Sequence, residues 1–217
     1  MNPEQAEQEI EHWYKGPIKW VLAIFLILII LLWLIPNYAV KLDPYPKYIP
    51  TIEEVVPAEI KIENITNSIE NRNDFLKFID VNDPVIKQTA DKIVTKACDS
   101  GKICHAKAIF YFVRNNFKYV SDPTAFEYLK TAKESLISKG GDCDDAVVLA
   151  ANLLGAVGIR TRFVFILNHV YIQAYLPEAL KKYKAEEEWV NLDLTCSYCE
   201  FGEIPLQNID AERSYLG

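Results

Sequence analysis

The apolar run Trp20–Ile35 constrains this chain more than any other feature. Its sixteen residues, WVLAIFLILIILLWLI, carry no charge. Ile18 extends the run across Lys19, whose long aliphatic stem lets its ammonium reach a membrane surface. At 1.5 Å per residue, a helix over residues 18–35 is about 27 Å long, enough to cross a bilayer core. The run predicts one transmembrane helix at 18–35, after an N-terminal tail at 1–17.

A cleaved signal peptide is the main alternative for this run. It needs a basic start, an apolar stretch of about 7 to 15 residues and small residues before the cut. The start MNPEQAEQEIEHWYKG is instead acidic, and Asn37 occupies one of the positions where a small residue is needed. Aromatic residues at both ends resemble the belts of a spanning helix: Trp13, Tyr14, Trp20, Trp33 and Tyr38. We expect an uncleaved anchor, whose orientation the evenly placed lysines do not determine.

Two regions of different composition follow the run. Residues 36–57 are punctuated by prolines, which favour extended backbone and predict a tether. Residues 58–217 have the composition of one soluble domain. The net charge of -7, with no cluster of Lys and Arg, argues against a nucleic-acid partner. The abundance of apolar and aromatic residues excludes a disordered chain.

Helices precede strands in the soluble region. Apolar residues have helical spacing between Ile69 and Val94, where Asp83 and Pro84 form a helix start, and again over 105–117. Three short segments rich in β-branched and aromatic residues then predict antiparallel strands: 160–166, 169–176 and 188–194. This order predicts an α+β fold. Strand alternation places His169 and Asp193 on the same face of one sheet.

The chemistry concentrates in GGDCDDAVVLAANLLGAVGI, where two glycines and an aspartate precede Cys143 at the start of an apolar helix. The amides and dipole of a helix N-terminus favour a thiolate and can later hold an oxyanion. Asp142, Asp144 and Asp145 act in the opposite direction, because like charges raise a thiol pKa, so a neighbouring imidazole must help. The alternative is a buried cysteine at a helix start capped by the aspartates.

These motifs resemble the transglutaminase-like superfamily of papain-type cysteine enzymes. GGDCDDAVVLAANLLGAVGIRTRF resembles its Gly-rich turn, nucleophile helix and "Gly-Ile-x-x-Arg" step. NHVYIQAYL offers the strand-initial histidine, and WVNLDLT matches "Trp-x-x-x-Asp-x-Thr". With the upstream segment IFYFVRNNFKYVSDP, the resemblance covers about residues 103–200. It implies a papain/transglutaminase-like fold in which the cysteine-bearing helix packs on an antiparallel sheet.

The resemblance also implies a role for each matched residue. Cys143 is the nucleophile, His169 is the base and later the acid, and Asp193 orients the imidazole. Asn191, on the same strand face, is the alternative orienting residue. Tyr119 is a weak candidate for the second oxyanion donor. His105 is expected to pack within its helix. No segment resembles a calcium loop, so we predict no calcium requirement and no other cofactor.

The other four cysteines form two close pairs, Cys98 with Cys104 and Cys196 with Cys199. Disulfides are the first interpretation, with Cys143 left as the free thiol. A four-thiolate zinc site and free thiols are the alternatives. The glycosylation sequon at Asn64 also favours an extracytoplasmic domain.

Together these features predict a single-pass membrane protein whose domain is a transglutaminase-like cysteine enzyme. We expect it to hydrolyse peptide, isopeptide or other amide bonds near the membrane or cell envelope. The expected partners are therefore the lipid bilayer and a peptide or amide substrate. A catalytically silent binding module and an envelope-assembly protein are the alternatives.

Overall fold

The computed structural model describes residues 16–57, 59–61, 69, 71–121 and 128–217. The chain divides into two units, Met1–Leu42 and Asp43–Gly217. Two features of the sequence lie outside the described residues, namely the N-terminal aromatic pair Trp13 and Tyr14, and the sequon at Asn64.

Helix α2, Ile18–Leu42, makes up the described part of the first unit almost entirely. It is long and apolar enough to cross a membrane, and most of its described apolar side chains are exposed. The helix continues seven residues past its predicted end at Ile35 and runs through Pro36. A proline removes one amide donor, and the neighbouring turns of an apolar helix tolerate that single loss.

The structure differs from the predicted tether at residues 36–57. Its second part, from Asp43 onward, belongs to the compact unit. The amide of Lys47 donates to the carbonyl of Ala97 at 2.8 Å. In the short helix α3, Ile52–Val55, both terminal side chains are buried. Prolines prevent a long helix here but do not prevent apolar residues from packing, so the domain starts at Asp43.

Four helices and one 3₁₀ helix form the helical layer of the domain: η1 Arg72–Phe78, α4 Pro84–Ala97, α5 Lys102–Asn116, α6 Ala132–Ser138 and α7 Cys143–Ala156. Asp83 caps α4 by accepting the amides of Val85 and Ile86 at 2.9 and 3.1 Å, as the sequence predicts. Helix α7 is buried along most of its length and contacts α4 and α5 as well as β4.

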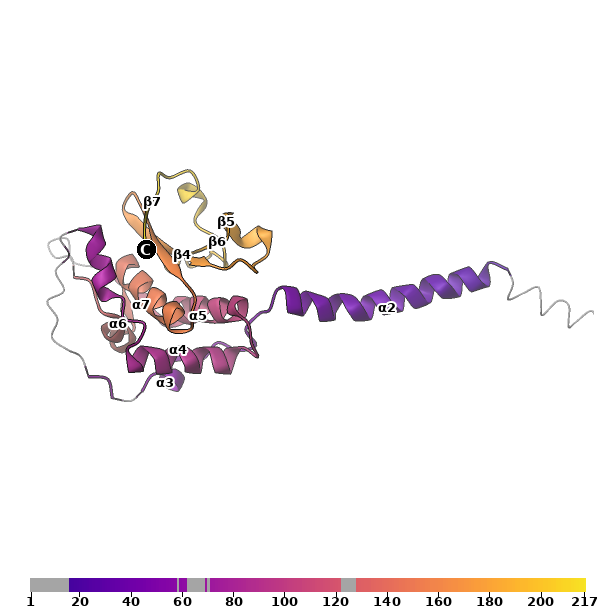
Figure 1. Cartoon of the computed structure of the whole chain (residues 1–217), viewed down its shortest axis with the longest axis horizontal. Helices are drawn as coiled ribbons and strands as arrows, with labels where there is room; N and C mark the ends of the chain where they lie inside the picture. The colour runs from indigo at the N-terminus through magenta and orange to yellow at the C-terminus, as the bar shows by residue number, and fades with distance from the viewer. Residues whose placement is uncertain (1–15, 58, 62–68, 70, 122–127) are drawn as a thin grey trace, which may run out of the picture. The chain divides into compact units, whose positions relative to one another are not determined.

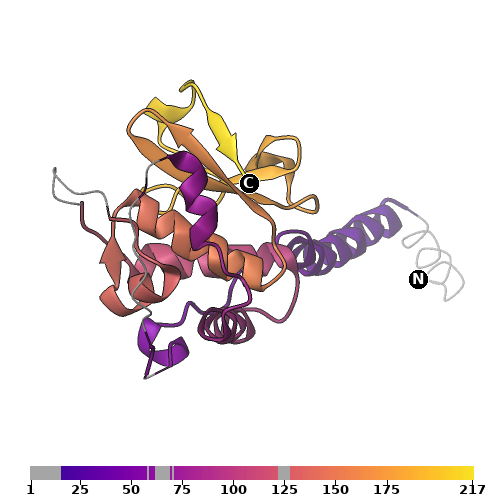
Figure 2. The same ribbon diagram turned by 60° about the vertical axis from the view of Figure 1, so that its left-hand side comes forward.

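The sheet is antiparallel, with strand order β5-β6-β4-β3-β7. Its strands are β3 Thr161–Ile166, β4 His169–Tyr175, β5 Lys184–Glu186, β6 Trp189–Leu192 and β7 Ser214–Leu216. The three predicted strands form its centre, and the helices cover one face (Figures 1 and 2). The α+β arrangement is confirmed. A separate parallel pair joins β1, Lys118–Tyr119, to β2, Gly140–Gly141.

The two faces of β4 differ as the alternation predicts. Val170, Ile172 and Ala174 face the main core with the helices. Tyr171 packs on the opposite face, where Ile204 of the C-terminal segment covers it. His169 and Gln173 share the face of Tyr171 because strand side chains alternate. His169 is the first residue of β4 and therefore lies at the end of the strand.

Candidate active site

Cys143 is the first residue of α7, and local hydrogen bonds fix its position. Asp142 is the N-cap, whose side chain accepts the amides of Asp144 at 3.0 Å and Asp145 at 3.2 Å. The side chain of Cys143 is half-buried. Its sulfur therefore lies at the positive end of a helix and remains reachable from solvent.

The two glycines before Asp142 are required by close packing. A Cβ atom at Gly141 would lie 2.0 Å from Oδ2 of Asp145, and one at Gly140 would lie 2.8 Å from the carbonyl oxygen of Lys118. Asp145 is fully buried and accepts the amide of Lys130 at 2.7 Å and its ammonium as well. The glycines thus let β1 and Asp145 approach the turn that presents Cys143.

His169 and Asp193 are in direct contact. Nε2 of His169 lies 2.8 Å from Oδ2 of Asp193, whose side chain is buried. The backbone amide of Val170 is near enough to the sulfur of Cys143 to lower its pKa, so the sulfur lies near the start of β4, the strand that begins with His169. Because Asp193 engages Nε2, Nδ1 is the ring nitrogen left to exchange a proton with a thiol.

These three residues fall within a family match. Residues 87–194 match the transglutaminase-like superfamily. This chain contains a transglutaminase-like domain. The match includes Cys143, His169 and Asp193, and the α+β fold with the cysteine helix packed on an antiparallel sheet agrees with it.

Solved structures show similarity at the level of the fold alone. LapG of Legionella pneumophila is 19% identical over 60% of this chain and 74% of that chain, with a TM-score of 0.44. A candidate cysteine protease of Cytophaga hutchinsonii is 20% identical over 58% of this chain, with a TM-score of 0.40. The match spans only 44% of the length of that protein. No curated protein matches the sequence.

The transglutaminase-like domain surrounds its free cysteine with acidic groups. Burial and the carboxylate of Asp144 raise the pKa of the Cys143 thiol to about 12. The thiol donates to Oδ1 of Asp144 at 3.3 Å, and Asp142 adds a weaker effect of the same sign. Asp145 differs from the sequence expectation, because its carboxylate is engaged by Lys130. Cys143 is therefore a thiol at neutral pH, and its ionisation requires a proton acceptor.

Replacing Asp144 by asparagine is expected to make Cys143 more reactive. Loss of the adjacent negative charge lowers the thiol pKa, so alkylation by iodoacetamide moves to lower pH and is about threefold to tenfold faster at pH 7. The rate is measured by mass spectrometry of quenched samples. Asp91→Asn, on the exposed side of α4, is the control and should not change the rate. A slower reaction for Asp144→Asn would mean that this carboxylate assists ionisation.

The alternative orienting residue, Asn191, has a different partner. Its Oδ1 accepts from Nε2 of Gln173 at 2.8 Å, and Gln173 in turn accepts from Arg162 at 2.7 Å. Asp193 is thus the group that contacts His169, in agreement with the motif match.

Two other sequence candidates have distinct positions. Tyr119 pairs with Gly141 across β1 and β2, and its side chain is 61% exposed. Burial raises the pKa of its phenol, with smaller effects from Cys143 and Asp142, which places Tyr119 near Cys143. Its role as a second oxyanion donor stays a prediction. His105 is half-buried in α5, and burial lowers its pKa, as a packing role would require.

Sequence reasoning missed two groups that contact the site. Lys130 lies outside the quoted motifs, and Val170 lies within one of them but acts through its backbone amide. Both act through contacts between distant segments, so no local pattern indicates them. Thr195 differs, because it belongs to the quoted motif and its hydroxyl lies 3.2 Å from Oδ1 of Asp193. The motif could therefore have indicated the contact between Thr195 and Asp193.

The remaining cysteines are paired as expected. Disulfides join Cys98 to Cys104 and Cys196 to Cys199, and Cys143 is free. Disulfide sulfurs do not offer the four thiolate ligands of a zinc site. Among the described residues, one trio of potential metal ligands lies within 4.8 Å, and it is Cys143 with its two flanking aspartates.

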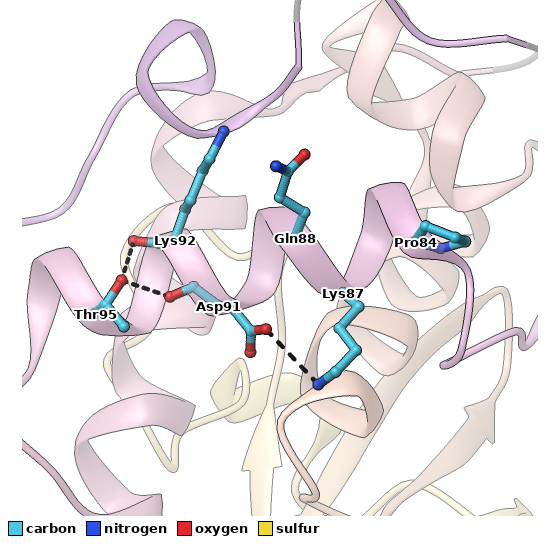
Figure 3. Close-up of a pocket in the computed structure, with 6 residues that line it drawn as sticks. All are labelled: Pro84, Lys87, Gln88, Asp91, Lys92 and Thr95. Atoms are coloured by element: carbon cyan, nitrogen blue, oxygen red, sulfur yellow. Dashed lines mark hydrogen bonds and ion pairs between the residues drawn. The ribbon is translucent and has the colours of Figure 1, made fainter.

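A hollow on the exposed side of α4 lies outside this site (Figure 3). Its lining comes from that helix alone: Pro84, Lys87, Gln88, Asp91, Lys92 and Thr95. Lys87 and Asp91 form an ion pair across one helical turn at 3.7 Å. The hollow contains none of the nucleophile, base or orienting candidates.

Proposed function

We propose that this protein is a membrane-anchored cysteine hydrolase that cleaves peptide, isopeptide or other amide bonds through a thioester. The supporting observation is the contact of His169 with Asp193 at one ring nitrogen, together with the nearness of the adjacent Val170 amide to the sulfur of Cys143. That arrangement supplies a nucleophile, a proton carrier and an orienting carboxylate in one place.

The acylation step uses each of these groups. His169 takes the thiol proton on Nδ1 while the sulfur of Cys143 attacks the carbonyl carbon and forms a C–S bond. The resulting oxyanion is held by the amide of Cys143 at the start of α7. When the C–N bond breaks, His169 gives its proton to the leaving amine, and a thioester remains on Cys143. Asp193 keeps the imidazole oriented and favours its protonated form in both transfers.

Deacylation reverses the roles with water as the acceptor. His169 removes a proton from water, the hydroxide oxygen attacks the thioester carbonyl, and the C–S bond breaks. The carboxylic acid leaves and the proton returns to the sulfur. The half-buried side chain leaves Cys143 accessible to water, the acceptor in this proposed hydrolysis.

The covalent intermediate is the direct test. Purified full-length protein mixed with the p-nitrophenyl ester of a blocked amino acid should gain the mass of one acyl group on the peptide that contains Cys143. Neutral hydroxylamine should remove it, because it cleaves thioesters. Cys143→Ser should carry no hydroxylamine-sensitive adduct. An adduct on another residue, or none in the wild type, would refute the proposal.

A catalytically silent binding module is the second candidate. The observation that favours it is the thiol pKa of about 12, since burial and Asp144 keep the sulfur protonated unless His169 accepts the proton. A silent module, or an envelope-assembly protein stabilised by its two disulfides, would form no acyl-enzyme. The same mass measurement therefore separates both alternatives from the hydrolase.

We place the domain on the extracytoplasmic side of a membrane crossed by α2. Two disulfides support an oxidising compartment, because cytoplasmic thiols are kept reduced. Protease added to intact cells is expected to remove an epitope tag placed after Gly217, while a cytoplasmic control protein stays intact. A tag that resists the protease until the cells are lysed would reverse this orientation.

A further inference from the structure

The turn after β6 fixes the carboxylate of Asp193. One oxygen, Oδ2, faces His169. The other, Oδ1, accepts the amide of Thr195, the hydroxyl of Thr195 and the amide of Cys196, each at 3.2 Å. These three donors come from two adjacent residues. The direction of the carboxylate therefore depends on the position of that turn.

The disulfide Cys196–Cys199 closes the same turn. Cys196 is one end of the disulfide and also a donor to Asp193. Cys196 and Cys199 are only 6% and 1% exposed, so the disulfide is packed inside the domain. A movement of Cys196 away from Asp193 is opposed by its covalent bond to Cys199.

The other end of the disulfide is fastened to α5. Arg114 donates from Nη1 to the carbonyl oxygen of Cys199 at 2.5 Å, and its guanidinium lies 4.7 Å from the ring centre of Tyr111. The hydroxyl of Tyr111 donates to Glu200, the next residue, at 2.6 Å. Cys199 is thus a fixed point on the helical layer, and the disulfide ties Cys196 to it.

We propose that the Cys196–Cys199 disulfide is a positioning element of the active site, which holds Asp193 toward His169. The proposal rests on the proposed function, since it assumes that His169 and Asp193 act together on Cys143. Without the disulfide, the Cys196 amide separates from Oδ1 and the carboxylate turns away from Nε2. The imidazole then loses its orienting partner, and Cys143 ionises less.

The two disulfides of the domain provide a matched pair of variants. The test pair is Cys196→Ala with Cys199→Ala, and the control pair is Cys98→Ala with Cys104→Ala. The control disulfide joins the end of α4 to the start of α5, and both close short loops, with sequence separations of 3 and 6. Each double variant leaves Cys143 as the free thiol, so iodoacetamide reports on the same sulfur in every protein.

We expect the test pair to react about tenfold more slowly than wild type at pH 7. The pH dependence of its alkylation should move to higher pH, as expected for Asp193→Ala. The control pair should follow the wild-type profile within about twofold, although both pairs lower the melting temperature through loss of a short cross-link. If the Cys196–Cys199 disulfide only stabilises the fold, its removal would lower the melting temperature without changing the pH dependence of alkylation.

Thr195→Val keeps the disulfide and removes one donor to Asp193. It therefore tests whether this turn orients the carboxylate if the test pair does not fold. Its profile should move in the same direction, with a rate about threefold lower at pH 7. A wild-type profile for the folded test pair overturns the proposal, and so does a wild-type profile for Thr195→Val. If Asp193→Ala also behaves as wild type, the proposed triad fails instead.

Discussion

The variant His169→Ala is expected to lose the alkylation of Cys143 at neutral pH, with a rate about 10² to 10⁴ lower than wild type. Burial and Asp144 raise the pKa of this thiol to about 12, so without a proton acceptor very little of the thiol is ionised at pH 7. The thiolate is the species that reacts with iodoacetamide. The remaining reaction should therefore rise steadily up to strongly alkaline pH.

His105→Ala provides the control for the loss of a histidine. His105 is half-buried in α5 and belongs to none of the candidate catalytic groups. Its variant should keep the wild-type alkylation profile, and melting curves of both variants should show whether either substitution unfolds the domain. Equal rates for His169→Ala and wild type at pH 7 would show that His169 does not ionise Cys143.

Replacing Asp193 by alanine is expected to have the next largest effect. The carboxylate accepts a charge-assisted hydrogen bond from Nε2 when His169 is protonated, and such a bond contributes about 1.5 to 3 kcal/mol. Its loss should move the alkylation profile of Cys143 to higher pH and lower the rate at pH 7 about tenfold to a hundredfold.

Asn191→Ala is the matched comparison on the same strand face. Asn191 is buried and binds Gln173, so its variant disturbs the same sheet without touching His169. Its profile should shift less than that of Asp193→Ala, and melting curves would reveal a shared loss of stability. A larger shift for Asn191→Ala would indicate that the side-chain amide of Asn191, and not Asp193, orients His169. If both profiles equal that of the wild type, neither residue orients the imidazole.

Local patterns were sufficient to predict that helices precede the three central strands and which side chains of those strands share a face. A strand alternates its side chains by geometry, so His169 and Asp193 had to share a face once both segments paired in one sheet. Helix start signals are equally local, and Asp83 and Asp142 cap α4 and α7 where the sequence places these helices. The apolar run gave α2, although its end at Leu42 lies beyond the predicted one.

Contacts between distant segments decided what these patterns could not. The approach of Lys130 to Asp145, the packing of Asp43–Pro57 on the helices and the amide of Val170 on Cys143 all join residues far apart in the chain, and no spacing rule records them. The sequence alone determined the candidates Cys143, His169 and Asp193. Tertiary structure decided that the thiol is half-buried beside Asp144 and that Asp193 reaches Nε2, because burial and hydrogen bonding depend on which segments meet in space.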